Sequence, residues 1–306
     1  MPELPEVETI RSGLQEKIVG LKIKQVEVLS PGKFFGNPKI LDGKIVLKVW
    51  RRAKILGIDL AGNHKGPVGS PSPVVALLFH LKMTGQLILI PGNKGRKASD
   101  QRLIGGHPTE DMVGPMPNKY TRAIFEFENG AKLYFNDLRK FGWIRVVESE
   151  ELKVMNEAGG MFALLGPEPL DQGFNLEDFT QRLLRRKNST IKEVILDQRV
   201  VAGVGNIYAC EALFHAKVDP RRKVSELSDP EIKGVFEGII FALSEGVAAG
   251  GSTRQHFVNI DGYRGYFLDN ACVYGREGDI CRVCGGRISK IKVGARGTFF
   301  CPQCQK

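Results

Sequence analysis

Apolar residues near the N-terminus recur at a helical spacing. Val7, Ile10, Leu14 and Ile18 follow one another at intervals of three, four and four residues, so they would line one face of a helix. Gly20 comes directly after this stripe and is expected to end the helix. The chain is therefore predicted to open with an amphipathic helix that buries one side.

From Leu21 to Val147 the pattern changes to short β-type runs separated by turn residues. Such a series predicts a sandwich or a barrel. Two stretches interrupt it, 61–73 and 91–117, and their Gly, Pro, Asn and charged residues predict exposed, mobile insertions. The predicted strands are 23–29, 44–50, 54–60, 74–80, 86–90, 122–128, 132–136 and 142–147.

Beyond Glu148 the periodicity becomes helical and then returns to β-type in the tail 272–306. Asn175 is expected to cap the first of these helices, and Ser228 or Asp229 the last. The segment 165–170 looks like a linker between two halves of the chain. The predicted helices are 176–186, 190–196, 204–214 and 229–248.

Length and charge narrow the class of protein. A chain of 306 residues can form two domains, and no apolar run approaches the roughly 20 residues that a membrane span needs. The first residues lack the basic segment and apolar stretch of a secretory signal. A net charge of +10 favours a polyanionic partner.

Four of the six cysteines lie in the last 26 residues. Cys281 and Cys284 form one Cys-x2-Cys pair, Cys301 and Cys304 form a second, and 16 residues separate the pairs, which is the spacing of a zinc ribbon. Four thiolates fill all tetrahedral positions, so we expect a structural Zn²⁺. The tail carries seven basic residues against two acids, so its hairpin could enter a nucleic-acid groove. A zinc-stabilised protein–protein module is the alternative.

The first residues could carry covalent chemistry. Removal of Met1 would leave Pro2 as a secondary amine, and an α-amino group with a pKa of about 7.7–8.0 is partly neutral near pH 7. A neutral amine can attack a sugar or carbonyl carbon to give a Schiff base, and Glu3 and Glu6 could move protons. The same residues also suit a plain helix start, with Pro5 in the first turn.

Three further motifs each allow two interpretations. Gly203 and Gly205 precede a predicted helix and could bring backbone amides to a phosphate, or form an ordinary helix–helix turn. Met83 lies at a turn, where it could wedge between bases or fill a core. Arg139 and Phe141 could contact an orphaned base and the duplex stack, or be a strand-edge charge beside a core ring.

Taken in this order, the motifs resemble the formamidopyrimidine-DNA glycosylase (8-oxoguanine DNA glycosylase) family over essentially the whole chain. The resemblance implies an α+β fold with an N-terminal helix and β-sandwich, followed by a helix–two-turn–helix domain and a four-cysteine zinc finger. It implies domain limits of 1–150, a linker at 151–170, 171–271 with a lesion-covering loop, and 272–306. The residues that carry it are 2–9, Lys54, 80–85, 137–142, 165–170, 201–208, 250–253 and the four cysteines.

The resemblance implies a base-excision repair enzyme that removes oxidised purines from duplex DNA and then cleaves the strand as an AP lyase. Pro2 would be the nucleophile and Glu3 the general acid, with Glu6 as a further proton carrier. Lys54 would serve proton transfer and phosphate contact, and Arg296 at the finger tip would serve δ-elimination. Implied DNA contacts are His80, Met83, Tyr120, Arg139, Phe141, Lys187, Lys192, Asn206 and Tyr208.

Some positions depart from the family pattern and leave alternatives open. Tyr120 to Arg122 stand where histidines are common, Lys82 stands where Gly or Arg is usual, and 254–257 differ in the loop thought to cover the base. An endonuclease VIII-like enzyme for oxidised pyrimidines is one alternative, although Leu4 argues against it. A non-catalytic lesion-binding protein and a zinc ribbon that only binds protein are the others. We expect a monomer that binds damaged double-stranded DNA, with no membrane partner, in a bacterial-type, nucleoid-associated cytoplasmic setting.

Overall fold

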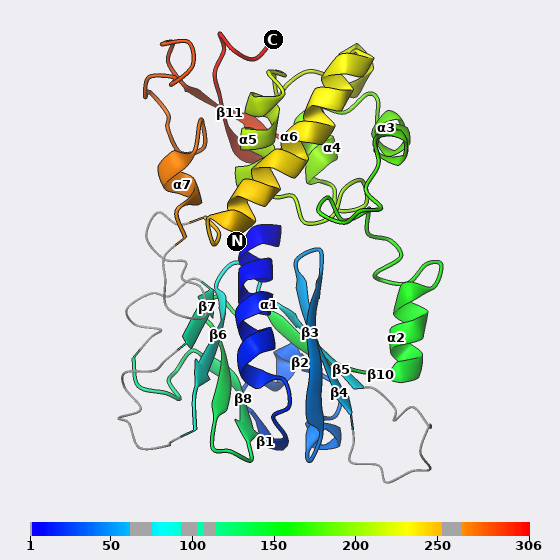
Figure 1. The fold of residues 1–306 in the computed structure, drawn as a ribbon, viewed down its shortest axis with the longest axis vertical. Helices are drawn as coiled ribbons and strands as arrows, with labels where there is room; N and C mark the ends of the chain where they lie inside the picture. Colours follow the sequence, from blue (N-terminus) through cyan, green and yellow to red (C-terminus); the bar gives the residue numbers. More distant parts are fainter. Residues whose placement is uncertain (1, 62–74, 93–102, 107–113, 253–264) are drawn as a thin grey trace. The chain divides into compact units, whose positions relative to one another are not determined.

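The computed structural model describes residues 2–61, 75–92, 103–106, 114–252 and 265–306, which form two compact units (Figure 1). As far as its residues are described, the first unit comprises Pro2, Glu6–Ala163 and Gly250–Gly265. The second unit comprises Glu3–Pro5, Leu164–Ala249 and Tyr266–Lys306. The α+β class expected from the sequence is confirmed, and the finer domain limits stay predictions.

Helix α1 (Leu4–Ile18) is the predicted amphipathic helix. Its apolar stripe, from Val7 to Ile18, is entirely buried in the core of the first unit. Gly20, at φ +82, follows the helix and turns the chain into the first strand, a backbone geometry that glycine adopts at little cost.

In the described part of the first unit the strands form two five-stranded sheets, in the orders β1-β8-β9-β6-β7 and β2-β10-β5-β4-β3. All eight predicted strands are present, and the sandwich prediction is confirmed. Their inward-facing apolar residues form one core, because side chains alternate across a strand. The strands are β1 (Ile23–Val28), β2 (Phe34–Phe35), β3 (Ile45–Arg52), β4 (Ile55–Ala61), β5 (Val75–His80), β6 (Gly85–Ile90), β7 (Leu103–Gly106), β8 (Thr121–Phe127), β9 (Lys132–Asp137) and β10 (Trp143–Glu148).

Strand β7 corrects the prediction that 91–117 is wholly an insertion, because it pairs with β6 inside that stretch. Its Gly105 lies so close to helix α1 that a Cβ atom there would come within 2.7 Å of the Ile10 side chain. The glycines that indicated a loop thus permit close packing of a strand on a helix. Of the predicted insertions, residues 62–73, 93–102 and 107–113 lie outside the described residues, whereas Ala61 belongs to β4.

Helices dominate the second unit, and its core is a separate apolar cluster that also takes in Leu4. The predicted caps are confirmed: Asn175 Oδ1 accepts the Asp178 N–H at 2.9 Å, and Ser228 forms a capping box with Glu231. The helices are α2 (Ser149–Asn156), which belongs to the first unit, and α3 (Leu176–Leu184), α4 (Ile191–Leu196), α5 (Asn206–His215), α6 (Asp229–Ala248) and α7 (Phe267–Asn270).

A β-hairpin of β11 (Ser289–Val293) and β12 (Arg296–Phe300) lies between the two cysteine pairs, as the tail pattern predicted. Gly294 and Ala295 form its two-residue turn, with φ of +55 and +60. Positive φ at both positions matches the right-handed twist of the strands, and it leaves Arg296 exposed beside the turn. Among the helices in the described ranges, none is long and apolar enough to cross a membrane.

Candidate functional site

Three turns meet at one end of the first unit. The sheet register aligns Ile55 with His80 and His80 with Trp143, so the turns next to these residues are neighbours. Lys54 comes from the turn between β3 and β4 and is largely buried. The turn between β5 and β6 carries Met83.

The third turn, between β9 and β10, carries Arg139 and Phe141. Together with Met83 these residues are called the wedge residues below. The guanidinium of Arg139 lies 5.3 Å from the centre of the Phe141 ring, a cation–π distance. Phe141 is 52% exposed and Met83 38% exposed, so their apolar surface is free to stack on a base.

His80 is held as a neutral donor beside these turns. Burial, together with the charges of Lys82 and Lys54, lowers its pKa to about 3. Its Nδ1 accepts the Lys82 N–H at 3.1 Å, so in the neutral ring Nε2 carries the proton. A neutral Nε2–H can donate to a phosphate oxygen without changing charge near pH 7.

Glu3 sits at the N-terminus of helix α5. Its carboxylate accepts the Ile207 N–H at 3.0 Å and the Tyr208 N–H at 3.4 Å, and the helix dipole favours a negative charge there. A Cβ on Gly205 would lie 2.1 Å from the Glu3 Cδ atom, so only glycine leaves room for this carboxylate. Backbone amides after these glycines thus hold the Glu3 carboxylate, and phosphate binding at this turn stays a prediction.

Glu6 is buried and anchored in the first unit. Its Oε1 accepts the N–H of Ser252 at 2.7 Å. Ser252 is the last described residue before the segment 253–264, which contains the predicted base-covering loop. The unusual residues 254–257 lie outside the described residues, and the proton-carrying role of Glu6 stays a prediction.

Lys192 and Asn206 both reach the finger hairpin. The fully buried Lys192 ammonium donates to Thr298 Oγ1 at 2.5 Å and to the Gly297 carbonyl at 3.4 Å. Asn206 Nδ2 donates to the same carbonyl at 2.9 Å. Burial lowers the pKa of Lys192, and the Cys210 thiol beside it opposes this shift. Both side chains therefore hold the turn next to Arg296.

The remaining predicted DNA contacts differ in exposure. Lys187 is exposed after helix α3, and Tyr120 is partly exposed before β8 with the Lys119 ammonium 5.0 Å from its ring centre. Tyr208 is buried, and its ring lies 4.7 Å from that of Phe267. Direct DNA contact by Tyr208 or Lys192 would need these side chains to become exposed, and it stays a prediction.

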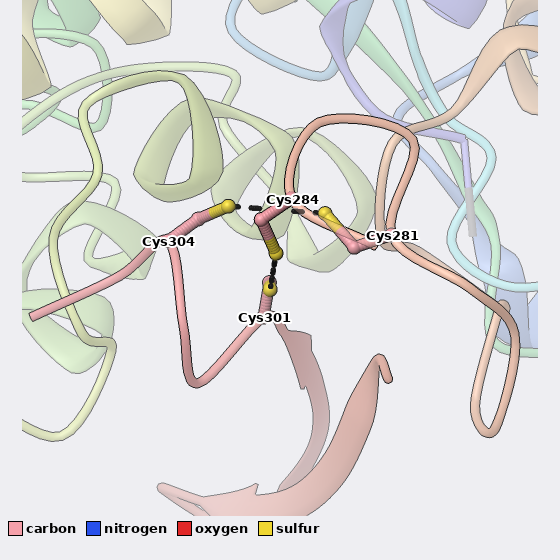
Figure 2. A group of neighbouring side chains, drawn as sticks. All are labelled: Cys281, Cys284, Cys301 and Cys304. Atoms are coloured by element: carbon pink, nitrogen blue, oxygen red, sulfur yellow. Dashed lines mark hydrogen bonds between the residues drawn. The ribbon is translucent and has the colours of Figure 1, made fainter. Parts of the chain in front are cut away.

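The four cysteines converge at the base of the hairpin (Figure 2). Their Sγ atoms all lie within 4.8 Å of one another, with Cys281 to Cys304 at 3.8 Å and Cys284 to Cys301 at 3.4 Å. Tetrahedral zinc with bonds of about 2.3 Å places its sulfur ligands about 3.8 Å apart. The cluster therefore fits one structural zinc ion, as predicted.

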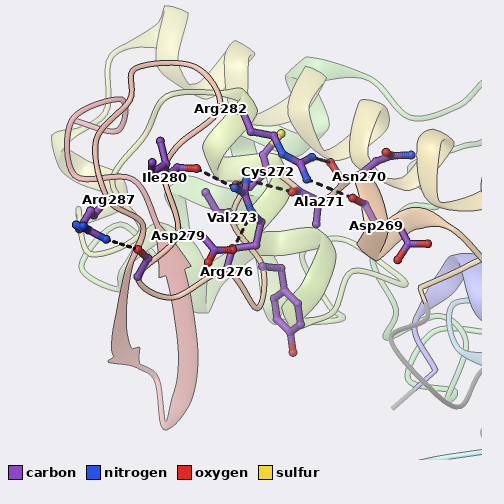
Figure 3. A network of polar contacts seen from close by, with 12 residues as sticks. Asp269, Asn270, Ala271, Cys272, Val273, Arg276, Asp279, Ile280, Arg282 and Arg287 are labelled. Atoms are coloured by element: carbon purple, nitrogen blue, oxygen red, sulfur yellow. Dashed lines mark hydrogen bonds and ion pairs between the residues drawn. The ribbon is translucent and has the colours of Figure 1, made fainter.

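Several basic residues of the tail donate to backbone carbonyls of the tail and of helix α7 (Figure 3). Arg276 donates to the carbonyls of Cys272 and Ile280, at 2.7 and 2.8 Å, and Arg282 donates to that of Asn270 at 3.1 Å. Arg287 donates to the Gly278 carbonyl at 2.9 Å. These guanidinium groups stabilise loops by satisfying backbone carbonyls. Fewer of the tail's positive charges are therefore available to a binding partner than its net charge indicates.

Glu211 is a structural carboxylate that the sequence patterns did not single out. It is buried in helix α5 and accepts the N–H groups of Cys272, Val273 and Tyr274 at 2.8, 3.0 and 2.7 Å. Burial raises its pKa, and these three hydrogen bonds oppose the rise. An acid inside the apolar run 207–214 was the available signal.

Three family models match the chain. The formamidopyrimidine-DNA glycosylase N-terminal domain matches residues 1–144, and the H2TH domain of the same enzymes matches residues 165–258. The zinc finger found in FPG and IleRS matches residues 278–306. Together the matches include both units and the cysteine cluster.

Curated relatives and solved structures match along the whole length. The formamidopyrimidine-DNA glycosylase of Listeria innocua is 39% identical over 315 residues, and that of Ruegeria pomeroyi is 36% identical over 314, each covering both chains completely. The Lactococcus lactis Fpg in complex with DNA containing an abasic site has a TM-score of 0.80 at 30% identity, covering 99% of each chain. The Thermus thermophilus Fpg has a TM-score of 0.78 at 35% identity, covering 99% of this chain and 98% of that one. The chain belongs to the formamidopyrimidine-DNA glycosylase family.

Proposed function

We propose that this enzyme, a base-excision repair glycosylase and AP lyase, removes oxidised purines from duplex DNA with Pro2 as its nucleophile. The observation that carries the proposal is the fixed Glu3 carboxylate. Backbone amides of helix α5 hold it, and the chain places it directly after Pro2. The start of helix α1 does not by itself require amides of helix α5 to hold the Glu3 carboxylate. This contact therefore favours a catalytic role for Glu3 over a plain helix start.

The chemistry follows from an amine next to a proton donor. The Pro2 nitrogen attacks C1′ of the damaged nucleotide, and the C1′–base bond breaks as the base leaves and takes up a proton from water. The Glu3 carboxylate takes the proton that the Pro2 nitrogen loses and passes it to the ring oxygen, which opens the sugar and leaves a Schiff base. The Schiff base makes the C2′ proton acidic. Loss of that proton breaks the 3′ phosphate bond, and a second elimination breaks the 5′ bond.

Lys54 and Arg296 would assist these steps. Lys54 is a cation at a turn of the first unit, in the neighbourhood of His80, and would contact phosphate and move protons. Arg296 is exposed beside the hairpin turn and would act in δ-elimination. Their separate contributions can be measured as the proportion of β- and δ-elimination products.

DNA binding would use both units. The wedge residues would fill the space of the flipped nucleotide, and flipping costs a few kcal/mol that their stacking partly offsets. His80, Tyr120, Lys187 and Asn206 would contact the backbone or neighbouring bases. We expect a monomer acting on chromosomal DNA in a bacterial cytoplasm. The cations among the proposed contacts, Lys54, Arg139 and Lys187, predict binding that weakens as salt rises.

Borohydride trapping tests the proposal. A duplex with 8-oxoguanine opposite cytosine should give a covalent protein–DNA adduct, which Pro2→Gly should abolish. Glu16→Gln, at an exposed position of helix α1, is a matched control that should trap like the parent protein. No adduct with this lesion or with an AP site would refute the assignment.

Two further comparisons sharpen the test. Oxidised-pyrimidine duplexes assayed in parallel separate this assignment from an endonuclease VIII-like preference. Protein that retains Met1 has no free proline amine and should bind damaged DNA without cutting it. Mass spectrometry of the N-terminus beside a nicking assay checks this, and full activity with Met1 present would contradict a role for Pro2.

A further inference from the structure

We propose that Asp137 is a positioning residue that, with Thr84 and Arg122, holds both turns carrying the wedge residues in the arrangement needed for base flipping. This inference rests on the proposed function, because it assigns a task to the wedge. Asp137 is 1% exposed and lies at the end of β9, where the chain leaves one sheet for the other. A buried carboxylate persists only where hydrogen bonds compensate its desolvation.

The Asp137 carboxylate joins the two turns. Its Oδ1 accepts the Thr84 hydroxyl at 2.5 Å and the Arg139 N–H at 3.3 Å, and its Oδ2 accepts the Gly142 N–H at 2.7 Å. Thr84 Oγ1 accepts the same Arg139 N–H at 3.0 Å. Thr84 belongs to the turn that carries Met83, whereas Arg139 and Gly142 belong to the turn that carries Phe141. One carboxylate therefore sets the spacing between the two parts of the wedge.

The backbone of Asp137 is held from the other side. Arg122 donates to its carbonyl through Nε at 3.0 Å and Nη2 at 2.7 Å, and the Asp137 N–H donates to the Tyr120 carbonyl at 2.9 Å. Burial lowers the pKa of Arg122 and the negative charge of Asp137 opposes this, but a guanidinium stays charged. Arg122, in the segment 120–122 that departs from the family pattern, thus holds the Asp137 backbone through two hydrogen bonds.

Both turns contain backbone that needs such support. Lys82 and Lys140 have φ of +53 and +56, a region that side-chain-bearing residues rarely adopt. A Cβ on Gly142 would lie 2.8 Å from the Phe135 ring and 3.0 Å from Asp137 Oδ2. Conformations of this kind persist only where the surroundings impose them: Asp137 accepts the N–H groups on either side of Lys140, and His80 Nδ1 accepts that of Lys82.

Loss of the Asp137 network should affect lesions whose base is still paired, and not AP sites. A wedge that is set in place before DNA arrives lowers the cost of displacing a base from its partner, and a small misplacement reduces the rate strongly. An AP site has no base to unpair, so its cleavage depends less on the wedge. Weakening the Asp137 network should therefore slow excision of paired 8-oxoguanine and leave cleavage of a preformed AP site unchanged.

Two substitutions of Thr84 test the positioning role of the Asp137 network: valine has nearly the shape of threonine, and serine keeps its hydroxyl group. Valine removes the hydroxyl that bridges the turns, whereas serine keeps it. We expect Thr84→Val to lower single-turnover excision of 8-oxoguanine paired with cytosine by about tenfold or more, with AP-site cleavage unchanged and Thr84→Ser close to the parent protein. Equal losses on both substrates, or no loss in either variant, would overturn the inference.

A binding signal separates this inference from the proposed chemistry. A 2-aminopurine beside the lesion brightens when its stacked neighbour leaves the helix, and Thr84→Val should weaken that rise while Thr84→Ser keeps it. A normal rise with Thr84→Val would overturn the positioning role. Parent protein that flips the base but gives no borohydride adduct would instead refute the role of Pro2 alone. Asp137→Asn is a second variant and should repeat the valine result, because its amide nitrogen donates and cannot accept a hydrogen bond from either turn.

Discussion

The carboxylate of Glu3 accepts the amide proton of Ile207 at 3.0 Å, although 204 positions separate the two residues in the chain. The proposed general acid is thus held by the first turn of helix α5, in the second unit. Leu4 reinforces this attachment, because its N–H donates to the Gly203 carbonyl at 3.1 Å and its side chain is fully buried. Glu3 and Leu4 are consequently anchored within the helical unit.

Gly205→Ala should therefore inactivate the enzyme. The new methyl group would lie 2.1 Å from the Glu3 carboxyl carbon and would displace it. We expect trapping and excision to fall by about a hundredfold, since a misplaced catalytic group costs this much. Gly234→Ala in helix α6 is the control: its Cβ would meet only Ala216, at 3.7 Å, and should add about 0.5–1 kcal/mol of stability. Similar activity in both variants would disprove the steric argument.

His80 should contribute a pH dependence to stability. Its pKa in the folded protein is about 3, below the ordinary 6.5, so between these values the unfolded chain binds the extra proton. Stability contributed by neutral His80 is complete above pH 6.5 and falls as pH drops towards 3, by up to about 1.4 kcal/mol per pH unit. Urea unfolding from pH 4 to 7 should show a steeper loss for the parent protein than for His80→Gln. Parallel curves would show that His80 is not held neutral.

Removal of zinc should unfold the finger hairpin. Zinc–thiolate binding supplies about 10 kcal/mol or more of folding free energy, and Cys284→Ser removes one of the four ligands. We expect loss of bound zinc in metal analysis and weak DNA binding in gel-shift assays. Cys272→Ser, outside the cluster, should keep both zinc and DNA binding. Retention of DNA binding after complete chelation would contradict a structural role for the metal.

Lys192→Met should change the ratio of δ- to β-elimination products more than it changes the free energy of unfolding. Thr298 Oγ1 still donates to the Arg296 carbonyl, and Asn206 still donates to that of Gly297, so little is left unsatisfied. The free energy of unfolding should change by about 1 kcal/mol, as for a typical hydrogen bond. The turn that carries Arg296 loses its buried anchor, so we expect less δ-elimination relative to β-elimination on denaturing gels. Lys233→Met, exposed on helix α6, should leave this ratio unchanged.

Local patterns alone predicted most of the fold. The stripe Val7 to Ile18 specified helix α1, alternation specified the eight strands, and the spacing of the cysteines specified the zinc site. These features depend on neighbours in sequence, because side-chain periodicity and ligand spacing are properties of short segments. Strand β7 was missed because its glycines signal a loop locally, although they serve close packing against Ile10.

The candidate functional site is built from contacts between residues far apart in the sequence, and no local pattern predicts such contacts. The sequence of this protein predicted its family, most of its strands and helices, its zinc ligands and a candidate nucleophile followed by an acid. Only the tertiary structure decided that the glycine turn at Gly205 receives Glu3, that Lys192 is buried under the hairpin, and that Asp137 joins two turns. The physical reason is that burial and hydrogen-bond geometry arise only when distant segments meet, and they determine which charges stay inside the protein.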